Sequence, residues 1–250
     1  MNDIIKIEGL KFRYDENGPY VLKGIDLTIK KGSVTAIVGL SGCGKSTLAL
    51  TLNGAIPQRV PGIMEGRVLV DGKDTRKTPV FELALKVGLV FQEPDNQLFL
   101  PTVEDEIAFG PENLCLPQHE IKDIIDRTLG LLRIESLRKK NPSQLSGGQK
   151  HLAALAAVLG LDPEVLVLDE PTAELDEENA RLVLGTVEKL KHAGKTVIII
   201  EHNLENLAIA DDILVMAGGK IIERIGGKKK SELLSDKVYE LLLSEVENAV

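Results

Sequence analysis

Aromatic residues are scarce in this chain of 250 residues, which has three Tyr, five Phe and no Trp. Cysteine is scarcer still, because Cys43 and Cys115 are the two thiols, too few for a disulfide framework or a zinc cluster. Such cysteine usage is typical of a protein from a reducing compartment. No apolar run approaches the ~18 residues that a membrane-spanning helix needs. The sequence therefore predicts neither a disulfide-stabilised secreted domain nor a membrane span.

Positive charge is also in short supply, since 30 Lys and Arg stand against 38 Asp and Glu and give a net charge of −8. The basic footprint of a nucleic-acid binder is therefore missing, and so are the clusters of Lys and Arg that attract anionic lipid. One compact basic run is present, Lys228, Lys229 and Lys230, and a solvated turn is its simpler interpretation. If the protein works at a membrane, we expect other proteins to hold it there.

Four apolar, strand-like runs are each followed by a group that can handle nucleotide phosphates. These groups are a glycine-rich loop after Val34–Val38, Gln92 after residues 87–91, Asp169 and Glu170 after residues 165–168, and His202 one residue after residues 197–200. Ligands of open α/β sheets bind beyond the carboxyl ends of parallel strands, so we expect the four groups in one crevice. The pattern predicts a nucleotide hydrolase.

The strand-like and helical patterns divide the chain into a split core and an insertion. Residues 4–38 have the pattern of strands, residues 93–160 are mostly helical, and strand and helix alternate again up to about residue 210. Such alternation indicates βαβ units and a parallel sheet. We therefore expect an α/β protein in which residues 1–92 and 161–226 form a nucleotide-binding core. Residues 93–160 would form a helical insertion and residues 227–250 a helical tail.

The glycine-rich loop fits the pattern G-x-x-x-x-G-K-S between a strand and a helix, the setting that favours a P-loop over a structural turn. Its glycines let backbone N–H groups surround a β-phosphate, where the dipole of the following helix adds positive potential. Lys45 would contact the β- and γ-phosphates, and the Ser46 hydroxyl would bind Mg²⁺. The expected nucleotide-binding residues of this loop are Gly39, Leu40, Ser41, Gly42, Cys43, Gly44, Lys45, Ser46 and Thr47.

Two carboxylates follow the run at residues 165–168. Asp169 would hold the hydration shell of Mg²⁺, which leaves Glu170 to orient and polarise the attacking water. An ordinary strand end with solvated acids is the alternative, and the P-loop motif weighs against it. Gln92 could contact Mg²⁺ and the water, or could be a surface residue. His202 could hydrogen-bond the γ-phosphate through a neutral imidazole, or could be only a strand-terminal histidine.

An aromatic pair near the start of the chain offers a contact for a nucleotide base. Phe12 and Tyr14 are two residues apart and hence lie on one face of a predicted strand. One ring could stack on adenine, or both could belong to the core. We favour Tyr14 as the stacking ring.

A second glycine-rich helix start, L-S-G-G-Q, can bind an anion through Ser146 and the N–H groups of Gly147, Gly148 and Gln149. Because the chain already has a P-loop, this second phosphate-binding feature is expected to serve the nucleotide of another chain.

In their order and spacing these motifs resemble a complete ABC-transporter ATPase, from residue 4 to about residue 225. The resemblance implies a P-loop ABC ATPase fold: a mainly parallel sheet with helices, an N-terminal antiparallel β part and an inserted helical subdomain. It implies ATP and Mg²⁺ as cofactors, with the metal at Ser46, Gln92 and Asp169. The catalytic residues it implies are Glu170, His202, Gln92 and Lys45, with Tyr14 at the base.

The same resemblance implies a head-to-tail dimer with a second ABC ATPase chain, identical or different. Two ATP molecules would each lie between one P-loop and the partner's L-S-G-G-Q, so residues 146–149 would act in trans. Asp176 would belong to the D-loop that links the two sites.

A narrower resemblance rests on residues 92–99, Q-E-P-D-N-Q-L-F, and residues 102–110, T-V-E-D-E-I-A-F-G. These segments are similar to the ATPases of energy-coupling factor (ECF) and cobalt or nickel importers. Such ATPases join a transmembrane coupling protein and a small substrate-binding membrane protein for a vitamin or a metal ion. The resemblance implies ATP-driven uptake of a micronutrient, by a subunit held peripherally on the cytoplasmic face of the cell membrane. It implies no nucleic-acid partner.

Two positions depart from the family pattern. His151 and Leu152 stand where Gln and Arg are frequent, and Glu201 precedes His202 where a small hydroxyl residue is common. A soluble ABC ATPase acting on DNA or ribosomes is an alternative function, against which the acidic charge weighs. An exporter ATPase is another, and residues 93–99 disfavour it.

Overall fold

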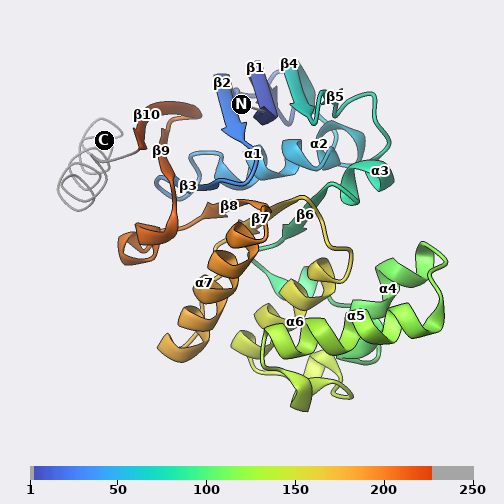
Figure 1. Cartoon of the computed structure of the whole chain (residues 1–250). Helices are drawn as coiled ribbons and strands as arrows, with labels where there is room; N and C mark the ends of the chain where they lie inside the picture. The colour runs from blue at the N-terminus through green and yellow to red at the C-terminus, as the bar shows by residue number, and fades with distance from the viewer. Residues whose placement is uncertain (1–2, 227–250) are drawn as a thin grey trace.

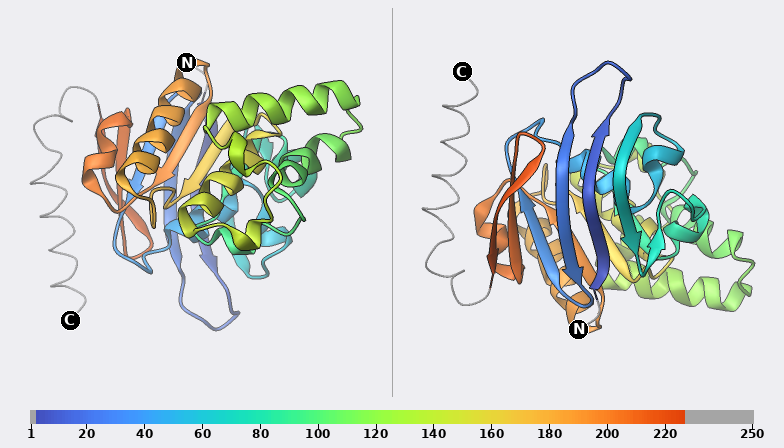
Figure 2. Two further views of the ribbon diagram at one scale, coloured as in Figure 1. Left: turned by 90° about the horizontal axis from the view of Figure 1, so that it is seen from below. Right: turned by 90° about the horizontal axis from the view of Figure 1, so that it is seen from above.

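The computed structural model describes residues 3–226, apart from the side chains of residues 204 and 205, and arranges them in layers (Figure 1). The outer layer is an antiparallel sheet with the strand order β2-β1-β4-β5. Figure 2, right, looks down on this sheet. Its strands are β1 (Asp3–Arg13), β2 (Leu22–Lys30), β4 (Ile63–Val70) and β5 (Lys73–Asp74).

The second sheet has the order β10-β9-β3-β8-β7-β6. The strands from β9 to β6 run parallel, and β10 lies antiparallel to β9 at the edge. All residues of β3, β6, β7 and β8 are buried, because layers cover these central strands on both faces. The strands are β3 (Val34–Val38), β6 (Val87–Val90), β7 (Val165–Asp169), β8 (Thr196–Ile200), β9 (Asp212–Ala217) and β10 (Lys220–Gly226).

Helices cover both faces of this parallel sheet. Helix α1 (Lys45–Leu52) lies between the two sheets, where Leu48 belongs to one core cluster with Ile5 and Val167. On the other face, α7 (Glu177–His192) and the helices between β6 and β7 share a second core cluster. The other helical segments are α2 (Ala55–Gln58), α3 (Val80–Ala84), α4 (Val103–Asn113), α5 (Gln118–Leu131), α6 (Gly147–Leu159) and the 3₁₀ turns η1 (Pro94–Asn96), η2 (Glu135–Leu137), η3 (Pro142–Gln144) and η4 (Leu204–Ile209).

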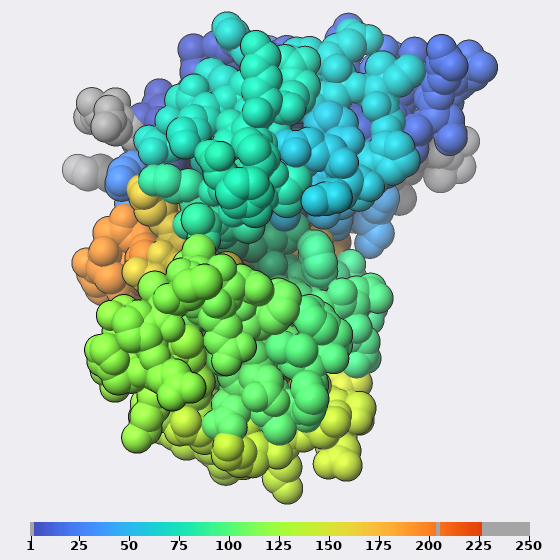
Figure 3. All heavy atoms as spheres, turned by 90° about the vertical axis from the view of Figure 1, so that its right-hand side faces the viewer, coloured from blue at the N-terminus to red at the C-terminus, as the bar shows by residue number. Residues whose placement is uncertain are grey.

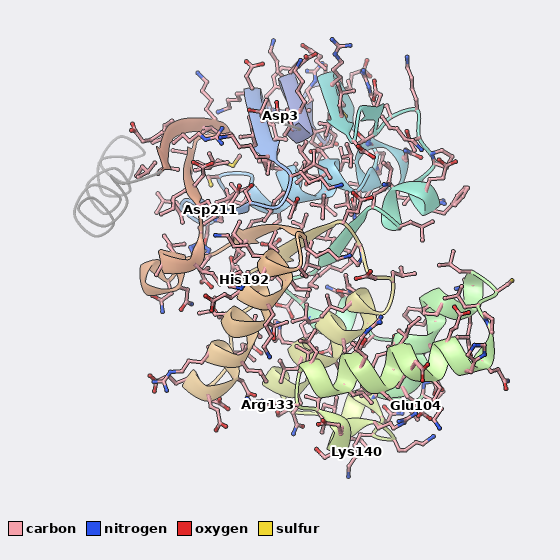
Figure 4. All side chains as sticks on the ribbon, viewed as in Figure 1. Asp3, Glu104, Arg133, Lys140, His192 and Asp211 are labelled. Carbon is pink, nitrogen blue, oxygen red and sulfur yellow. The ribbon has the colours of Figure 1, made fainter. Side chains whose placement is uncertain are left out.

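Helices α4, α5 and α6 lie to one side of the sheets (Figure 1). Thr102 caps α4 by accepting a hydrogen bond from the N–H of Asp105. Glu104, labelled in Figure 4, forms ion pairs with Lys139 and with Arg138 (2.6 Å), and these two cations hold the pKa of Glu104 below its usual range. The ion pairs join α4 to the segment before α6. Across residues 3–226, the helices lack the combination of length and apolar character that a membrane crossing requires.

The structure differs from the sequence prediction at the start of the chain. Within residues 4–38 the sequence pattern predicts separate strands at residues 4–8 and 12–14, but β1 is continuous, because Gly9 has φ +57 and allows a bulge. A Cβ on Gly66, which faces the bulge, would lie 2.4 Å from the carbonyl oxygen of Gly9. The chain bends after Arg13, so the prediction that Tyr14 lies on a strand with Phe12 is wrong. The expected tail and the run of three lysines lie outside the described residues.

Candidate active site

Strand pairing places the ends of four strands at one edge of the parallel sheet. Ile37 of β3 and Asp169 of β7 both pair with Ile200 of β8, and Val90 of β6 pairs with Leu168 of β7. Because these strands run in the same direction, the segments after them leave the sheet on the same side. The four groups singled out from the sequence are therefore neighbours.

The loop between β3 and α1 comes close to the end of β9. A Cβ at Gly39 would lie 2.2 Å from the carbonyl oxygen of Met216, and Gly44 has φ +104, so both positions require glycine. The buried ammonium of Lys45 donates to the carbonyl oxygens of Gly39 (2.9 Å) and Leu40 (3.0 Å). The first turn of α1 has no acidic residue, so its N–H groups and its dipole can bind a phosphate.

A pocket of ≈ 300 Å³ opens beside this loop, and its lining residues are Tyr14, Val21, Gly42, Gly44, Lys45, Ser46 and Thr47. The Tyr14 hydroxyl lies 2.9 Å from Oγ1 of Thr47, and the Tyr14 ring meets Phe12 edge to face at 4.9 Å. Phe12 is fully buried, whereas Tyr14 is 43% exposed. Tyr14 therefore offers a ring surface on which a base could stack, and Phe12 is a core residue.

Four residues of the glycine loop do not line this pocket: Gly39, described above, Leu40, Ser41 and Cys43. Leu40 and Ser41 are exposed at the tip of the loop. Cys43 is a free, buried cysteine, and its Sγ would lie 2.8 Å from a Cβ at Gly39. The thiol thus packs inside the loop.

Ser46, Gln92 and Asp169, the residues expected at the metal, line a second pocket of ≈ 320 Å³. Burial raises the pKa of Asp169, and a hydrogen bond from Ser46 opposes that rise. Oδ1 of Asp169 is buried without a hydrogen-bond partner in the described part of the chain. A hydroxyl, an amide and a carboxylate with a free buried oxygen fit a hard cation such as Mg²⁺.

Glu170 is held between two of the other predicted site residues. Its Oε2 accepts a hydrogen bond from Nε2 of Gln92 (2.9 Å), and its Oε1 lies 2.7 Å from Nε2 of His202. Glu170 also has φ +52, an unfavourable value for a residue with a side chain. Two side chains from neighbouring strand ends thus hold the carboxylate at the carboxyl edge of the sheet, and neither Glu170 nor His202 lines the two pockets beside the glycine loop.

The L-S-G-G-Q segment begins α6. The Ser146 hydroxyl accepts from the N–H of Gln149 (3.4 Å), and Oε1 of Gln149 accepts from the N–H of Ser146 (3.1 Å). A Cβ at Gly147 would lie 2.7 Å from Oε2 of Glu174, so a carboxylate of the same chain contacts this helix start. Residues 146–149, Gly148 included, line neither of the two pockets beside the glycine loop.

Asp176 caps α7, because its side chain accepts a hydrogen bond from the N–H of Asn179 (2.8 Å).

The two departures from the family pattern are buried. His151 and Leu152 point into the protein, and burial lowers the pKa of His151. Glu201 accepts four hydrogen bonds, and the sequence analysis did not predict this role. The one sequence signal for this role was an acid directly before His202.

The family model for the ABC transporter matches residues 22–173, more than half of the chain. The chain belongs to the ABC transporter ATP-binding family. This ABC ATPase is 44% identical over 221 residues to an energy-coupling factor transporter ATP-binding protein, EcfA, of Methanosarcina acetivorans, covering 88% of this chain and 78% of that protein. It is 46% identical over 222 residues to a protein of Pyrococcus horikoshii provisionally named an ABC transporter ATP-binding protein, with the same coverage of 88% and 78%.

Some relatives are much longer than this chain. It spans 38% and 34% of the length of two ABC transporter ATP-binding proteins from Methanosarcina mazei and Methanosarcina acetivorans, each 42% identical.

Solved structures of the family confirm the ABC ATPase fold expected from the sequence. CbiO1 of Clostridium perfringens, described as part of the ABC transporter complex cbiONQ, matches with a TM-score of 0.81 and 35% identity, covering 100% of this chain and 98% of that one. The ATP-binding cassette MJ0796, solved as a dimer with ADP and phosphate, matches with a TM-score of 0.80 and 26% identity, covering 89% and 98%.

Proposed function

We propose that the chain hydrolyses ATP to drive uptake of a small micronutrient, a vitamin or a transition-metal ion, through separate membrane subunits. The placement of Glu170 is the observation that most directly supports ATP hydrolysis. Its carboxylate follows β7 at the carboxyl edge of the sheet, where Gln92 and His202 hold it at 2.9 and 2.7 Å. A carboxylate held in this way can accept a proton from an attacking water.

The other residues of the site have complementary tasks in this mechanism. The N–H groups of the glycine loop bind the β-phosphate, and Lys45 transfers its hydrogen bonds from the loop carbonyls to the β- and γ-phosphates. Ser46, Gln92 and Asp169 would hold Mg²⁺, which would supply positive charge to the phosphate oxygens. His202 turns its one N–H donor from Glu170 to the γ-phosphate, and Tyr14 stacks on adenine.

The working unit in this proposal is a dimer. The start of α6 has free N–H groups, yet residues 146–149 line neither pocket beside the glycine loop of their own chain. These residues therefore contact the ATP of a second ABC ATPase chain, as the dimeric cassette with ADP and phosphate supports. Asp176 and its neighbours before α7 lie between the two sites.

An apolar groove supports attachment to membrane subunits. It has a volume of ≈ 260 Å³ and lies between the sheet strand β6 and helices α4 and α6, on the face seen in Figure 3. Phe99 and Phe109 line it as an edge-to-face pair at 5.3 Å and are 68% and 45% exposed. A cytoplasmic helix of a transmembrane coupling protein occupies this groove, beside a small substrate-binding membrane protein. The chain is thereby held at the cytoplasmic face of the cell membrane.

The segment that carries the importer resemblance builds one wall of this groove. Gln97 binds back to β6 by donating to the Leu89 carbonyl (3.2 Å) and accepting from the Phe91 N–H (3.1 Å). Buried Glu106 accepts from the N–H groups of Phe99 (2.5 Å) and Leu100 (2.6 Å), and burial raises the pKa of Glu106. The groove is thus joined to β6, the strand that leads to Gln92, so movement of the docked helix reaches the catalytic edge.

The hydrolysis is tested with Glu170→Gln, which keeps the shape of the side chain but removes the base. We expect ATP turnover to fall about 100-fold or more while ATP binding persists, so that a closed dimer accumulates. Turnover is measured by phosphate release, and the dimer by light scattering with ATP. Turnover near that of the wild type would exclude Glu170 as the base.

The transport role is tested by a mild-detergent pull-down of the tagged chain from its native membranes. We expect a multi-span coupling protein and a small substrate-binding membrane protein to co-purify with the wild type, and both to be lost in Phe99→Asp. Phe81→Asp is the matched control, because Phe81 is 69% exposed on α3 but does not line the groove. Equal loss in both variants would contradict docking in the groove. Recovery with nucleic acid or ribosomes would overturn the transport role.

A further inference from the structure

Glu201 is a buried carboxylate at the carboxyl end of β8, and its side chain is not solvated but bound by protein groups. One oxygen, Oε1, accepts hydrogen bonds from the backbone N–H groups of His202 (2.9 Å) and Asn203 (3.0 Å). This oxygen therefore fixes the backbone of the loop that carries the His202 imidazole.

The other oxygen, Oε2, binds a different segment of the chain. It accepts from the hydroxyl of Thr172 (2.5 Å) and from Nδ2 of Asn206 (3.2 Å), and this Nδ2 also lies 3.1 Å from Oγ1 of Thr172. Thr172 stands two residues after Glu170 and four before Asp176. A single side chain thus connects the loop after β8 with the segment that runs from the catalytic carboxylate to α7.

The burial of Glu201 makes this connection strong. A carboxylate removed from water must keep its donors, because each one lost takes a hydrogen bond from a buried oxygen that water does not replace. The backbone of Glu201 is also held, since its N–H donates to the Ile37 carbonyl of β3 (3.2 Å). The two segments can therefore shift together, but a shift of one alone breaks hydrogen bonds to a buried charge.

We propose that Glu201 is a positioning residue that makes the His202 loop and the segment from Thr172 to Asp176 move as one unit. The inference rests on the proposed function, in which His202 contacts the γ-phosphate and the segment before α7 lies between the two ATP sites. When the γ-phosphate leaves one ATP site, the His202 loop moves, and Glu201 makes the segment that faces the other ATP site move with it. Glu201 touches neither nucleotide nor water in this role.

The test uses the full chain and two variants that keep side-chain shape. Glu201→Gln can still accept from the N–H groups of His202 and Asn203, but its amide nitrogen meets the Asn206 amide donor-to-donor. Thr172→Val removes the hydroxyl alone. Each is expected to lower kcat about 10-fold, because a misplaced catalytic group loses rate steeply with distance, while KM for ATP stays within about 3-fold. The double variant is expected to match the single variants, since both break the same connection.

A matched control separates this effect from a loss of stability. Glu164→Gln removes another carboxylate, which accepts charge-assisted hydrogen bonds from Lys31 and Lys86 at the opposite end of the sheet. We expect it to lower Tm without changing kcat. Unchanged kcat in Glu201→Gln and Thr172→Val, or additive losses in the double variant, would overturn the proposal.

Amide hydrogen exchange of the nucleotide-free chain tests, without any ATPase measurement, whether Glu201 connects the two segments. Thr172→Val is expected to speed exchange at the amides of His202 and Asn203 by about 10-fold, because Glu201 loses a partner that orients it. Exchange equal to that of the wild type would overturn the connection. A wild-type chain that hydrolyses no ATP would instead overturn the proposed function, so the two failures are distinguishable.

Discussion

At the residue scale, Tyr14 has two separable parts. Its ring is partly exposed beside the glycine loop, and its hydroxyl lies 2.9 Å from Oγ1 of Thr47. Tyr14→Ala is expected to weaken ATP binding by about 1–2 kcal/mol, because stacking of a base on an aromatic ring contributes on that order. Tyr14→Phe keeps the ring and is expected to bind ATP within about 5-fold of the wild type, since one hydrogen bond is worth about 1 kcal/mol.

Titration with a fluorescent ATP analogue measures both Tyr14 variants. Tyr20→Ala is the control, because Tyr20 hydrogen-bonds Glu65 and lies under Arg13, away from the pocket lining. Equal weakening by Tyr14→Phe and Tyr14→Ala would show that the hydroxyl, and not the ring, is what ATP binding requires.

At the scale of elements, the turn before α7 meets the start of α6 through Glu174. This residue has φ +61 and places Oε2 2.7 Å from where a Cβ at Gly147 would be. Glu174→Gly relieves about 1 kcal/mol of backbone strain. It also adds chain entropy of about 0.5–1 kcal/mol to the unfolded state, so little change in Tm is expected. The loss of a negative charge where the partner's γ-phosphate would bind is expected to tighten ATP-driven dimerisation about 5-fold.

Glu174→Gln separates the charge from the backbone. It removes the carboxylate but keeps the backbone strain, so it is expected to tighten the dimer to the same extent as Glu174→Gly. Glu177→Gln is the control, an exposed acid nearby that pairs with Arg181 on α7. Dimerisation is measured by light scattering against ATP concentration, and an equal shift in all three variants would contradict a specific role of Glu174.

The elements themselves were largely predictable, because their signals are local. Continuous apolar runs predicted β3, β7 and β8 with nearly correct bounds, and the glycine-rich L-S-G-G-Q motif predicted the start of α6. Strand order then brought Gln92, Glu170 and the other predicted groups together. The strands β9 and β10 were missed: β10 alternates half-buried and exposed residues without a strong apolar run, whereas β9 has such a run at residues 213–217 that was overlooked.

The contacts of the site were less predictable than its members. Hydrogen bonds join Glu201 to Thr172 and Asn206, which are 29 and 5 positions away in the sequence. The contact of Glu174 with Gly147 likewise joins two separate segments. Neither pair has a periodic pattern or a motif, because tertiary packing alone creates it. The oxygen of Asp169 without a partner is likewise a property of burial in the folded chain.

At the scale of the whole molecule, the parallel sheet has one functional edge and one structural edge. The carboxyl ends of the strands carry the predicted ATP site. The opposite ends are held by Glu164, which precedes β7 and pairs with Lys31 before β3 (2.8 Å) and with Lys86 before β6. Stability can therefore be changed at one edge without disturbing chemistry at the other.

The pH dependence of stability at Glu164 allows the structural edge to be tested separately from the functional edge. Lys31 and Lys86 hold the pKa of Glu164 at about 2, below the ordinary value of 4.5. Because the folded-state pKa lies below the unfolded one, the stabilisation is fully present above about pH 4.5. It is lost as the pH falls from there toward 2. Glu164→Gln is expected to cost about 1 kcal/mol at pH 7, an amount already reduced for partial exposure to solvent, and to lower Tm by about 2–4 °C.

Thermal unfolding of the wild type and of Glu164→Gln, followed by circular dichroism between pH 7 and pH 3, measures how the stabilisation by Glu164 changes with pH. The difference in Tm should be constant from pH 7 to about pH 5.5 and should narrow below about pH 4.5, as the wild-type carboxylate takes up its proton. ATP turnover at pH 7 should be the same in both chains, because the ion pairs lie at the structural edge. A difference in Tm that widens on acidification would mean that the two lysines do not stabilise the folded state through this charge.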